Sequence, residues 1–168
     1  MKTKIYKLNG KDNKRIIEEA GQIIRSGGLV VFPTETVYGI GANALNKDAS
    51  KNIYQVKGRP SDNPLIVHIA DQNDLEKYVK NISGYAYKLI DKFWPGSLTL
   101  IFEKRDLIPY EITGGLDTVA IRIPNNKIAQ ELIREAQVPI CAPSANISGK
   151  PSSTLYEHVF DDLFGKVD

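Results

Sequence analysis

The chain has 168 residues, of which 42% are hydrophobic and 25% charged, a composition that suits one folded domain and excludes an intrinsically disordered chain. Lysine and arginine number 22 against 20 acidic residues, so the net charge of +2 gives none of the broad positive field that marks many nucleic-acid-binding proteins. Its single cysteine, Cys141, offers neither an internal disulfide nor a cluster of metal ligands, which fits a reducing cytoplasm.

The amino terminus, MKTKIYKLNGKDNK, is polar and lacks the apolar core of a signal peptide. No apolar run approaches the roughly 20 residues that a membrane span needs. We therefore expect a soluble, cytoplasmic protein with no membrane partner.

Helices and strands are expected to alternate along the chain. Apolar residues recur at helical spacing over residues 12–28, where Gly27 and Gly28 supply the stop. Short apolar β-branched runs predict strands at 29–33, 65–70, 98–103, 118–124 and 139–142. Periodic apolar positions predict further helices at 48–57, 74–80, 85–93, 127–136 and 154–164. The pattern predicts a single domain over residues 1–168, of α+β (α/β-type) class, with helices packed on a sheet.

The first polar loop, PTETVYGIGANA at 33–44, formally contains the G-x-G-x-x-G/A fingerprint of dinucleotide-binding proteins. We reject the match because Pro33 and five further residues precede the first glycine, and no amphipathic helix opens at Gly41. Two interpretations stay open: a glycine-rich turn behind a strand, or a loop that binds a polar ligand. The second accounts better for the hydroxyl and acidic residues of the loop, which are Thr34, Glu35, Thr36 and Tyr38.

The second loop opens KGRPSDNPLIVHI, residues 57–69, where Lys57, Arg59 and His68 are cationic or can become so. The two cations could simply complement the carboxyl end of a helix. Alternatively, prolines at 60 and 64 make the loop rigid, and the guanidinium of Arg59 binds a phosphate or carboxylate through two parallel hydrogen bonds. His68 alone is more often a hydrogen-bonded core histidine than a ligand.

The third loop, CAPSANISGKPSS at 141–153, is either a cap for the next helix, through Ser152 or Ser153, or a surface where Ser144 and Asn146 bind a ligand. A charge in the predicted strand at 118–124, TVAIRIP, bears on the same question. Arg122 interrupts apolar neighbours, and such a charge is costly unless it is paired or faces a polar cavity. Arg122 is therefore either an edge-strand charge or part of a site.

Five stretches, PTETVYG, KGRPSDNPLIVHI, FWPGSLT, TVAIRIP and APSANISGKPS, together resemble the YrdC-type domain of threonylcarbamoyl-AMP synthases, in that order and with the expected spacing. The resemblance runs from about Gly27 to the end of the chain. It implies a twisted mixed sheet flanked by helices and folded around a concave, basic cavity.

The resemblance also implies a reaction, in which L-threonine, bicarbonate and ATP give threonylcarbamoyl-adenylate and pyrophosphate on the way to threonylcarbamoyladenosine in tRNA. Every reactant is anionic or carries an anionic group, so charge neutralisation and alignment are the main requirements. Mg²⁺ is expected to arrive with the triphosphate, without a protein metal site. Downstream tRNA-modifying transferase proteins are the implied partners, and direct contact with tRNA fits the same role.

The resemblance also implies which residues form the site, because the family's motifs can be matched to positions of this sequence. The K-x-R pair is Lys57 and Arg59, and the S-x-N pair is Ser144 and Asn146; these four are the implied catalytic centre. The implied ATP contacts are Arg59, Asn63, Thr118, Ser144 and Ser152. The implied threonine contacts are Thr36, His68, Arg122 and the backbone around Ala142.

Two alternatives stay open beside the synthase: a non-catalytic RNA-binding module, and a domain that handles carbamoyl-adenylate, as in hydrogenase-maturation proteins. Weak overall charge and the lack of an RNA-binding aromatic motif argue against the first. Family members usually continue into a Glu-Ser-Thr strand, and some into a second domain. We therefore expect this chain to lack a C-terminal strand segment.

Overall fold

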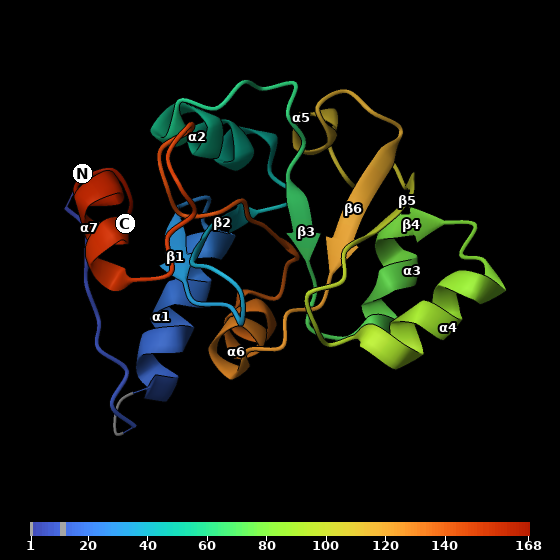
Figure 1. Cartoon of the computed structure of the whole chain (residues 1–168), viewed down its shortest axis with the longest axis horizontal. Helices are drawn as coiled ribbons and strands as arrows, with labels where there is room; N and C mark the ends of the chain where they lie inside the picture. Colours follow the sequence, from blue (N-terminus) through green and yellow to red (C-terminus); the bar gives the residue numbers. More distant parts are fainter. Residues whose placement is uncertain (1, 11–12) are drawn as a thin grey trace.

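The computed structural model describes residues 2–10 and 13–168 (Figure 1). Its helices are α1 (Asn13–Arg25), α2 (Lys47–Lys57), α3 (Leu75–Tyr78), α4 (Gly84–Phe93), α5 (Tyr110–Thr113), α6 (Lys127–Ala136) and α7 (Tyr156–Leu163), with a 3₁₀ turn, η1, at Gln72–Asp74. Its strands are β1 (Val30–Phe32), β2 (Gly39–Asn43), β3 (Ile66–His68), β4 (Val79–Lys80), β5 (Leu100–Lys104), β6 (Thr118–Arg122) and β7 (Ile140–Cys141). No helix in these described ranges combines the length and apolar character needed to cross a membrane.

The strands form one seven-stranded sheet in the order β1-β2-β7-β3-β6-β5-β4. Only β3 and β6 pair in parallel among the strands described, and the other neighbours are antiparallel. Figure 1 shows helices α1 and α6 side by side, and α3 and α4 near the end of the sheet formed by β5 and β4. The predicted mixed sheet flanked by helices is confirmed.

Helix α1 packs closely on α6 because Gly21 carries no side chain. A Cβ atom there would lie 2.8 Å from the carbonyl carbon of Glu135, closer than real contacts allow. Ile17 and Ile24 of α1 form one buried cluster with Leu132 of α6 and neighbouring residues. A second, larger cluster joins α2 and the middle strands, and together the two clusters fix the sheet beneath the polar loops.

The segment 33–44 departs from its predicted loop, because residues 39–43 form strand β2 between β1 and β7. Gly41 lies in that strand where a Cβ atom would come within 2.7 Å of both Ile140 and the Phe32 ring. Both glycines therefore lie in a strand and not in a turn, and Gly41 allows its close packing. No helix opens at Gly41, so the rejection of the dinucleotide fingerprint is confirmed.

Two other sequence predictions are wrong in part, and a third falls on a residue that the structure does not describe. The predicted helix at 74–80 ends at Tyr78, because Val79 and Lys80 pair with β5, and the short helix α5 was not predicted. Ser152 and Ser153 do not cap α7, whose N-cap position is Leu155. The predicted start of the first helix at residue 12 lies outside the described residues.

Candidate functional site

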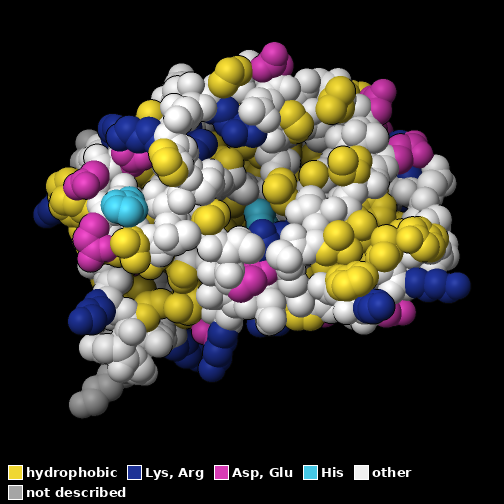
Figure 2. Space-filling model, viewed as in Figure 1, with side chains coloured by type: hydrophobic (Ala, Val, Ile, Leu, Met, Phe, Trp, Pro, Cys, Tyr) yellow, Lys and Arg dark blue, Asp and Glu magenta, His cyan; other side chains and the backbone are white. Residues whose placement is uncertain are grey.

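Three loops meet on one face of the molecule and are joined through their backbones. Ala145 N donates to Tyr38 O at 2.7 Å, Tyr38 N donates to Ser153 O at 2.9 Å, and Ser148 N donates to Lys57 O at 2.8 Å. Figure 2 shows this face hollowed in front of β3, with Lys or Arg and His side chains inside the hollow and an acidic side chain at its edge. The polar loops singled out in the sequence therefore form a single site.

Lys57 is the last residue of α2 and is only 2% exposed. Its Nζ donates to the carbonyl oxygens of Ser144 and Asn146, at 2.5 Å each. Burial, and secondarily the charge of Arg59, lowers the pKa of Lys57 to about 8. Lys57 thus lies at the carboxyl end of a helix, as the sequence indicated, but it is buried there and anchors the S-x-N segment.

Asn146 presents an unused acceptor. Its Nδ2 donates to Ile147 O and Lys150 O, both at 2.9 Å, and these two bonds fix the orientation of the amide. The residue is 5% exposed, and its Oδ1 is buried without a partner among the described residues. Such an orphaned acceptor carries an energetic cost unless a ligand supplies a donor.

Asp162 holds the same loop from α7. One carboxylate oxygen accepts from Ile147 N at 2.9 Å, and the other accepts from Lys150 Nζ at 2.5 Å. The hydrogen bond from Lys150, followed by that from Ile147, lowers the pKa of Asp162 below its ordinary value. This residue was not predicted from the sequence, since its role depends on where α7 docks.

Arg59 is partly exposed and folds back on its own loop. Its Nη2 donates to Asn63 Oδ1 at 2.6 Å and to Pro64 O at 3.1 Å, and its Nε donates to Asn63 O at 3.2 Å. Two residues assigned to nucleotide contact are thus already in contact with each other.

Arg122 joins the loops from the other side and is 8% exposed. Its Nε donates to Gly96 O at 3.0 Å, its Nη2 donates to Glu35 Oε1 at 2.6 Å, and both terminal nitrogens lie 3.4 Å from Thr36 Oγ1. Because β6 lies between β3 and β5, the interpretation of Arg122 as an edge-strand charge is wrong. It is buried and paired with Glu35.

His68 lies beside Arg122, since the two residues pair in the register of β3 and β6. Its Nδ1 lies 3.2 Å from Ile66 O, and its ring meets Phe32 edge-on with 6.4 Å between centroids. The side chain is 3% exposed; burial, and secondarily the charge of Arg122, lowers the pKa of His68 to about 4. His68 is therefore neutral near pH 7, and the site holds two cationic side chains from KGRPSDNPLIVHI, not three.

The parallel register separates the predicted contacts into two ends. Ile66 pairs with Ala120, so the loop at 59–64 and Thr118 lie at one end, while His68 and Arg122 lie at the other. Four residues at about 3.3 Å each separate Thr118 from Arg122 by about 13 Å. The predicted nucleotide residues and the predicted amino-acid residues are thus neighbours along the same strands.

The remaining predicted residues lie around these two ends. Ser144 follows β7 and bridges to Gly39. The backbone N–H of Ala142 donates to Ile66 O at 2.9 Å, so it is already used within the sheet. Thr118 and Ser152 are exposed. Glu35 was noticed only as part of a polar loop, and its sequence signal was an acid between two threonines.

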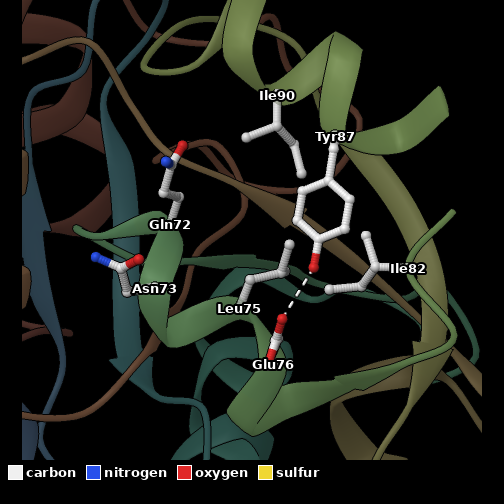
Figure 3. Close-up of a pocket in the computed structure, with 7 residues that line it drawn as sticks. All are labelled: Gln72, Asn73, Leu75, Glu76, Ile82, Tyr87 and Ile90. Atoms are coloured by element: carbon white, nitrogen blue, oxygen red, sulfur yellow. Dashed lines mark hydrogen bonds between the residues drawn. The ribbon is translucent and has the colours of Figure 1, made fainter. Parts of the chain in front are cut away.

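Two cavities lie away from this site. One, of about 190 Å³, lies beside α3 and α4 and is lined by residues that include Leu75, Ile82 and Ile90; the hydroxyl of Tyr87 donates to Glu76 Oε1 there at 2.9 Å (Figure 3). The other, of about 240 Å³, is lined by residues that include Trp94, Pro95 and Arg134. Neither includes a predicted site residue. Within the described ranges, no three His, Cys, Asp or Glu side chains are grouped to hold a metal ion.

The chain is similar to known proteins. The family model for Sua5, YciO and YrdC proteins, described as "Telomere recombination", matches residues 22–168. The threonylcarbamoyl-AMP synthase of Pyrococcus abyssi is 55% identical over 152 residues, covering 90% of this chain and 45% of the relative. That of Bacillus subtilis is 52% identical over 172 residues, covering 99% of this chain and 50% of the relative.

A solved structure extends the similarity to the fold. The crystal structure of P. abyssi Sua5 complexed with L-threonine superposes with a TM-score of 0.91 at 50% identity, covering 100% of this chain and 47% of that one. The chain thus spans about half the length of these relatives.

Proposed function

Because the chain belongs to the Sua5/YciO/YrdC family, we propose that it is an L-threonylcarbamoyladenylate synthase, a nucleotidyltransferase acting on L-threonine, bicarbonate and ATP. The observation that carries the proposal is the two-ended site along β3 and β6. His68 and Arg122 lie at one end, and Arg59, Asn63 and Thr118 lie at or near the other.

At the amino-acid end, Arg122 is the group that binds the threonine carboxylate. A guanidinium can donate two parallel hydrogen bonds to a carboxylate, and the Nη1 and Nη2 atoms of Arg122 make only long contacts with Thr36 along that edge. Thr36 and neutral His68 are polar side chains beside it. The burial of Arg122 and His68 strengthens their interactions relative to water.

At the nucleotide end, Arg59, Asn63, Thr118, Ser144 and Ser152 contact ATP, and the charge of Arg59 offsets that of the phosphates. Lys57 is joined to the S-x-N segment by its two hydrogen bonds. An ammonium group has three donors, so two carbonyl acceptors leave one for a ligand oxygen. The unpartnered Asn146 Oδ1 supplies a nearby acceptor for a donor on the ligand.

Catalysis in this proposal consists of alignment and charge neutralisation. The threonine carbamate and the α-phosphate of ATP are both anionic, so positive groups must bring them together. Lys57, bonded to the S-x-N segment, and Arg59, at the nucleotide end, provide that charge. A Mg²⁺ ion bound to the triphosphate adds further neutralisation, and it would be held by phosphate oxygens because the described residues offer no acidic cluster.

The wider role follows the same proposal. The adenylate is passed on to tRNA-modifying transferase proteins for threonylcarbamoyladenosine synthesis in the cytoplasm. Residues 1–168 act as one domain that carries both substrate contacts.

Pyrophosphate release tests the proposal. The chain is assayed with ATP and bicarbonate in the presence of threonine, serine or valine, and the Lys51→Ala variant, altered at an exposed position of α2, serves as the control. We expect release that requires both threonine and bicarbonate. Replacement of Arg122 by lysine keeps the positive charge but removes the bidentate hydrogen-bond donor. It should therefore raise the KM for threonine more than the KM for ATP. Release that ignores the amino acid would contradict the assignment.

A further inference from the structure

Glu35 is an acidic side chain in a site whose proposed ligands are anions. Its carboxylate is bonded to Arg122 at 2.6 Å, and its side chain is 23% exposed. The loop at 33–38 therefore brings a negative charge to the cation assigned to the threonine carboxylate. A site built only to attract anions has no use for such a charge.

The donors of Arg122 allow Glu35 and a ligand to bind together. Nε is used by Gly96 O, and one Nη2 donor is used by Glu35. The edge formed by Nη1 and Nη2 makes only the two contacts of 3.4 Å with Thr36 Oγ1. A ligand carboxylate bound on this edge would then lie beside the carboxylate of Glu35, and two such neighbours repel each other.

An α-amino acid removes that repulsion because its ammonium group sits on the carbon next to its carboxylate. Arg122 and Glu35 together are neutral, and a zwitterion is neutral as well, so the combined site carries no excess charge. A 2-deamino acid of the same shape would add one uncompensated negative charge beside Arg122 and Glu35, whose side chains are 10% and 23% exposed, which is costly.

Resting on the proposed function, we propose that Glu35 binds the α-ammonium group of the amino acid while Arg122 binds its carboxylate. The pair thereby selects a zwitterionic α-amino acid. Although partial burial acts in the opposite direction, the hydrogen bond from Arg122 keeps the pKa of Glu35 below its ordinary value. Glu35 is therefore ionised at neutral pH, as an ammonium partner must be.

The same contact has a consequence for carbamate formation, R–NH₃⁺ + HCO₃⁻ → R–NH–COO⁻ + H₂O + H⁺. A C–N bond forms and a C–O bond of bicarbonate breaks; the nitrogen loses two protons, one of which leaves in the water molecule. The positive partner of Glu35 disappears and a negative group replaces it. Repulsion by Glu35 then favours a carbamate turned toward Lys57 and Arg59, where the nucleotide lies.

Calorimetry on the full chain tests this inference with two ligands, L-threonine and (R)-3-hydroxybutyrate, which lacks the amino group. The variants are Glu35→Gln, which keeps an oxygen acceptor but removes the charge, and Glu157→Gln as a control on exposed α7. We expect Glu35→Gln to weaken threonine binding at least tenfold without weakening hydroxybutyrate binding, because a charged hydrogen bond is lost only for threonine. Glu157→Gln should leave both affinities unchanged.

A Glu35→Asp variant and the parent protein supply the remaining tests. Glu35→Asp keeps the charge and should restore part of the preference for threonine, whereas a purely structural role would not distinguish the two ligands. Equal or tighter threonine binding by Glu35→Gln would overturn the inference and leave the proposed function standing. If the parent prefers threonine over hydroxybutyrate by less than tenfold, the inference fails even without a variant. A parent that binds ATP but no threonine would contradict both proposals.

Discussion

Acid should destabilise the protein through His68, because its imidazole is neutral in the folded state at pH values where it is charged in the unfolded chain. Its pKa falls from 6.5 to about 4 on folding. Between these values the unfolded state binds more protons, so the free energy of unfolding decreases as the pH falls. The full difference corresponds to roughly 3 kcal/mol, since one pKa unit is about 1.4 kcal/mol.

Urea unfolding at pH 8 and pH 5 measures the effect. At pH 5 about 2 kcal/mol of the difference has been lost, which moves the midpoint by about 1 M for a protein of this size. His68→Gln removes the imidazole and should reduce the pH dependence by that amount. His158→Gln is the matched control, because His158 is exposed on α7 and should leave the pH dependence unchanged.

The change in the free energy of unfolding with pH is compared between the parent and His68→Gln, and this comparison separates the effect of His68 from that of other acid-sensitive groups. Glu35 and Asp162 also have lowered pKa values, but they titrate in both the parent and the His68→Gln variant. A His68→Gln variant that loses stability between pH 8 and pH 5 as steeply as the parent would refute the reasoning. The reasoning would also be refuted if only the His158→Gln variant showed a weaker dependence of the free energy of unfolding on pH.

The other predictions concern ligand binding and the buried lysine. Arg59→Ala should weaken ATP binding at least tenfold while its unfolding midpoint stays near that of Lys51→Ala, as calorimetry and urea unfolding can show; equal ATP affinity would remove Arg59 from the nucleotide site. Lys57→Met should lower the free energy of unfolding by about 2 kcal/mol at pH 7, because two buried carbonyls lose their donor; unchanged stability would contradict the anchoring role. Threonine should bind better than serine by about 1–3 kcal/mol, the effect of one methyl group, and far better than valine, which lacks the hydroxyl; calorimetry that finds valine equal to threonine would count against the assigned amino-acid contacts.

The fold could be predicted where local pattern and final environment agree. Runs such as LIVHIA and TVAIRIP became buried strands, and the periodic segments became helices. Strand β2 was missed because GIGAN has the composition of a turn. Its strand conformation depends on Phe32 and Ile140 filling the space above Gly41, a contact that only the folded chain reveals.

The candidate site could likewise be predicted only in part from the sequence. The resemblance to the family grouped Lys57, Ser144 and Asn146, and the structure joins them, as Lys57 donates to the carbonyl oxygens of Ser144 and Asn146. Burial could not be read from the motif, so the sequence indicated neither that Lys57 is buried nor that His68 is neutral near pH 7. The bond between Glu35 and Arg122 spans 87 positions and arises from strand order, which no local pattern encodes.

Incorporation of ¹³C-labelled bicarbonate tests the central claim most directly. The chain is incubated with ATP, Mg²⁺, L-threonine and labelled or unlabelled bicarbonate, and the nucleotide products are analysed by mass spectrometry. A threonylcarbamoyladenylate synthase yields an adenylate that contains threonine and is one mass unit heavier with the label, together with an equal amount of pyrophosphate. Pyrophosphate release with no label in the adenylate, or an adenylate that lacks threonine, would contradict the claim.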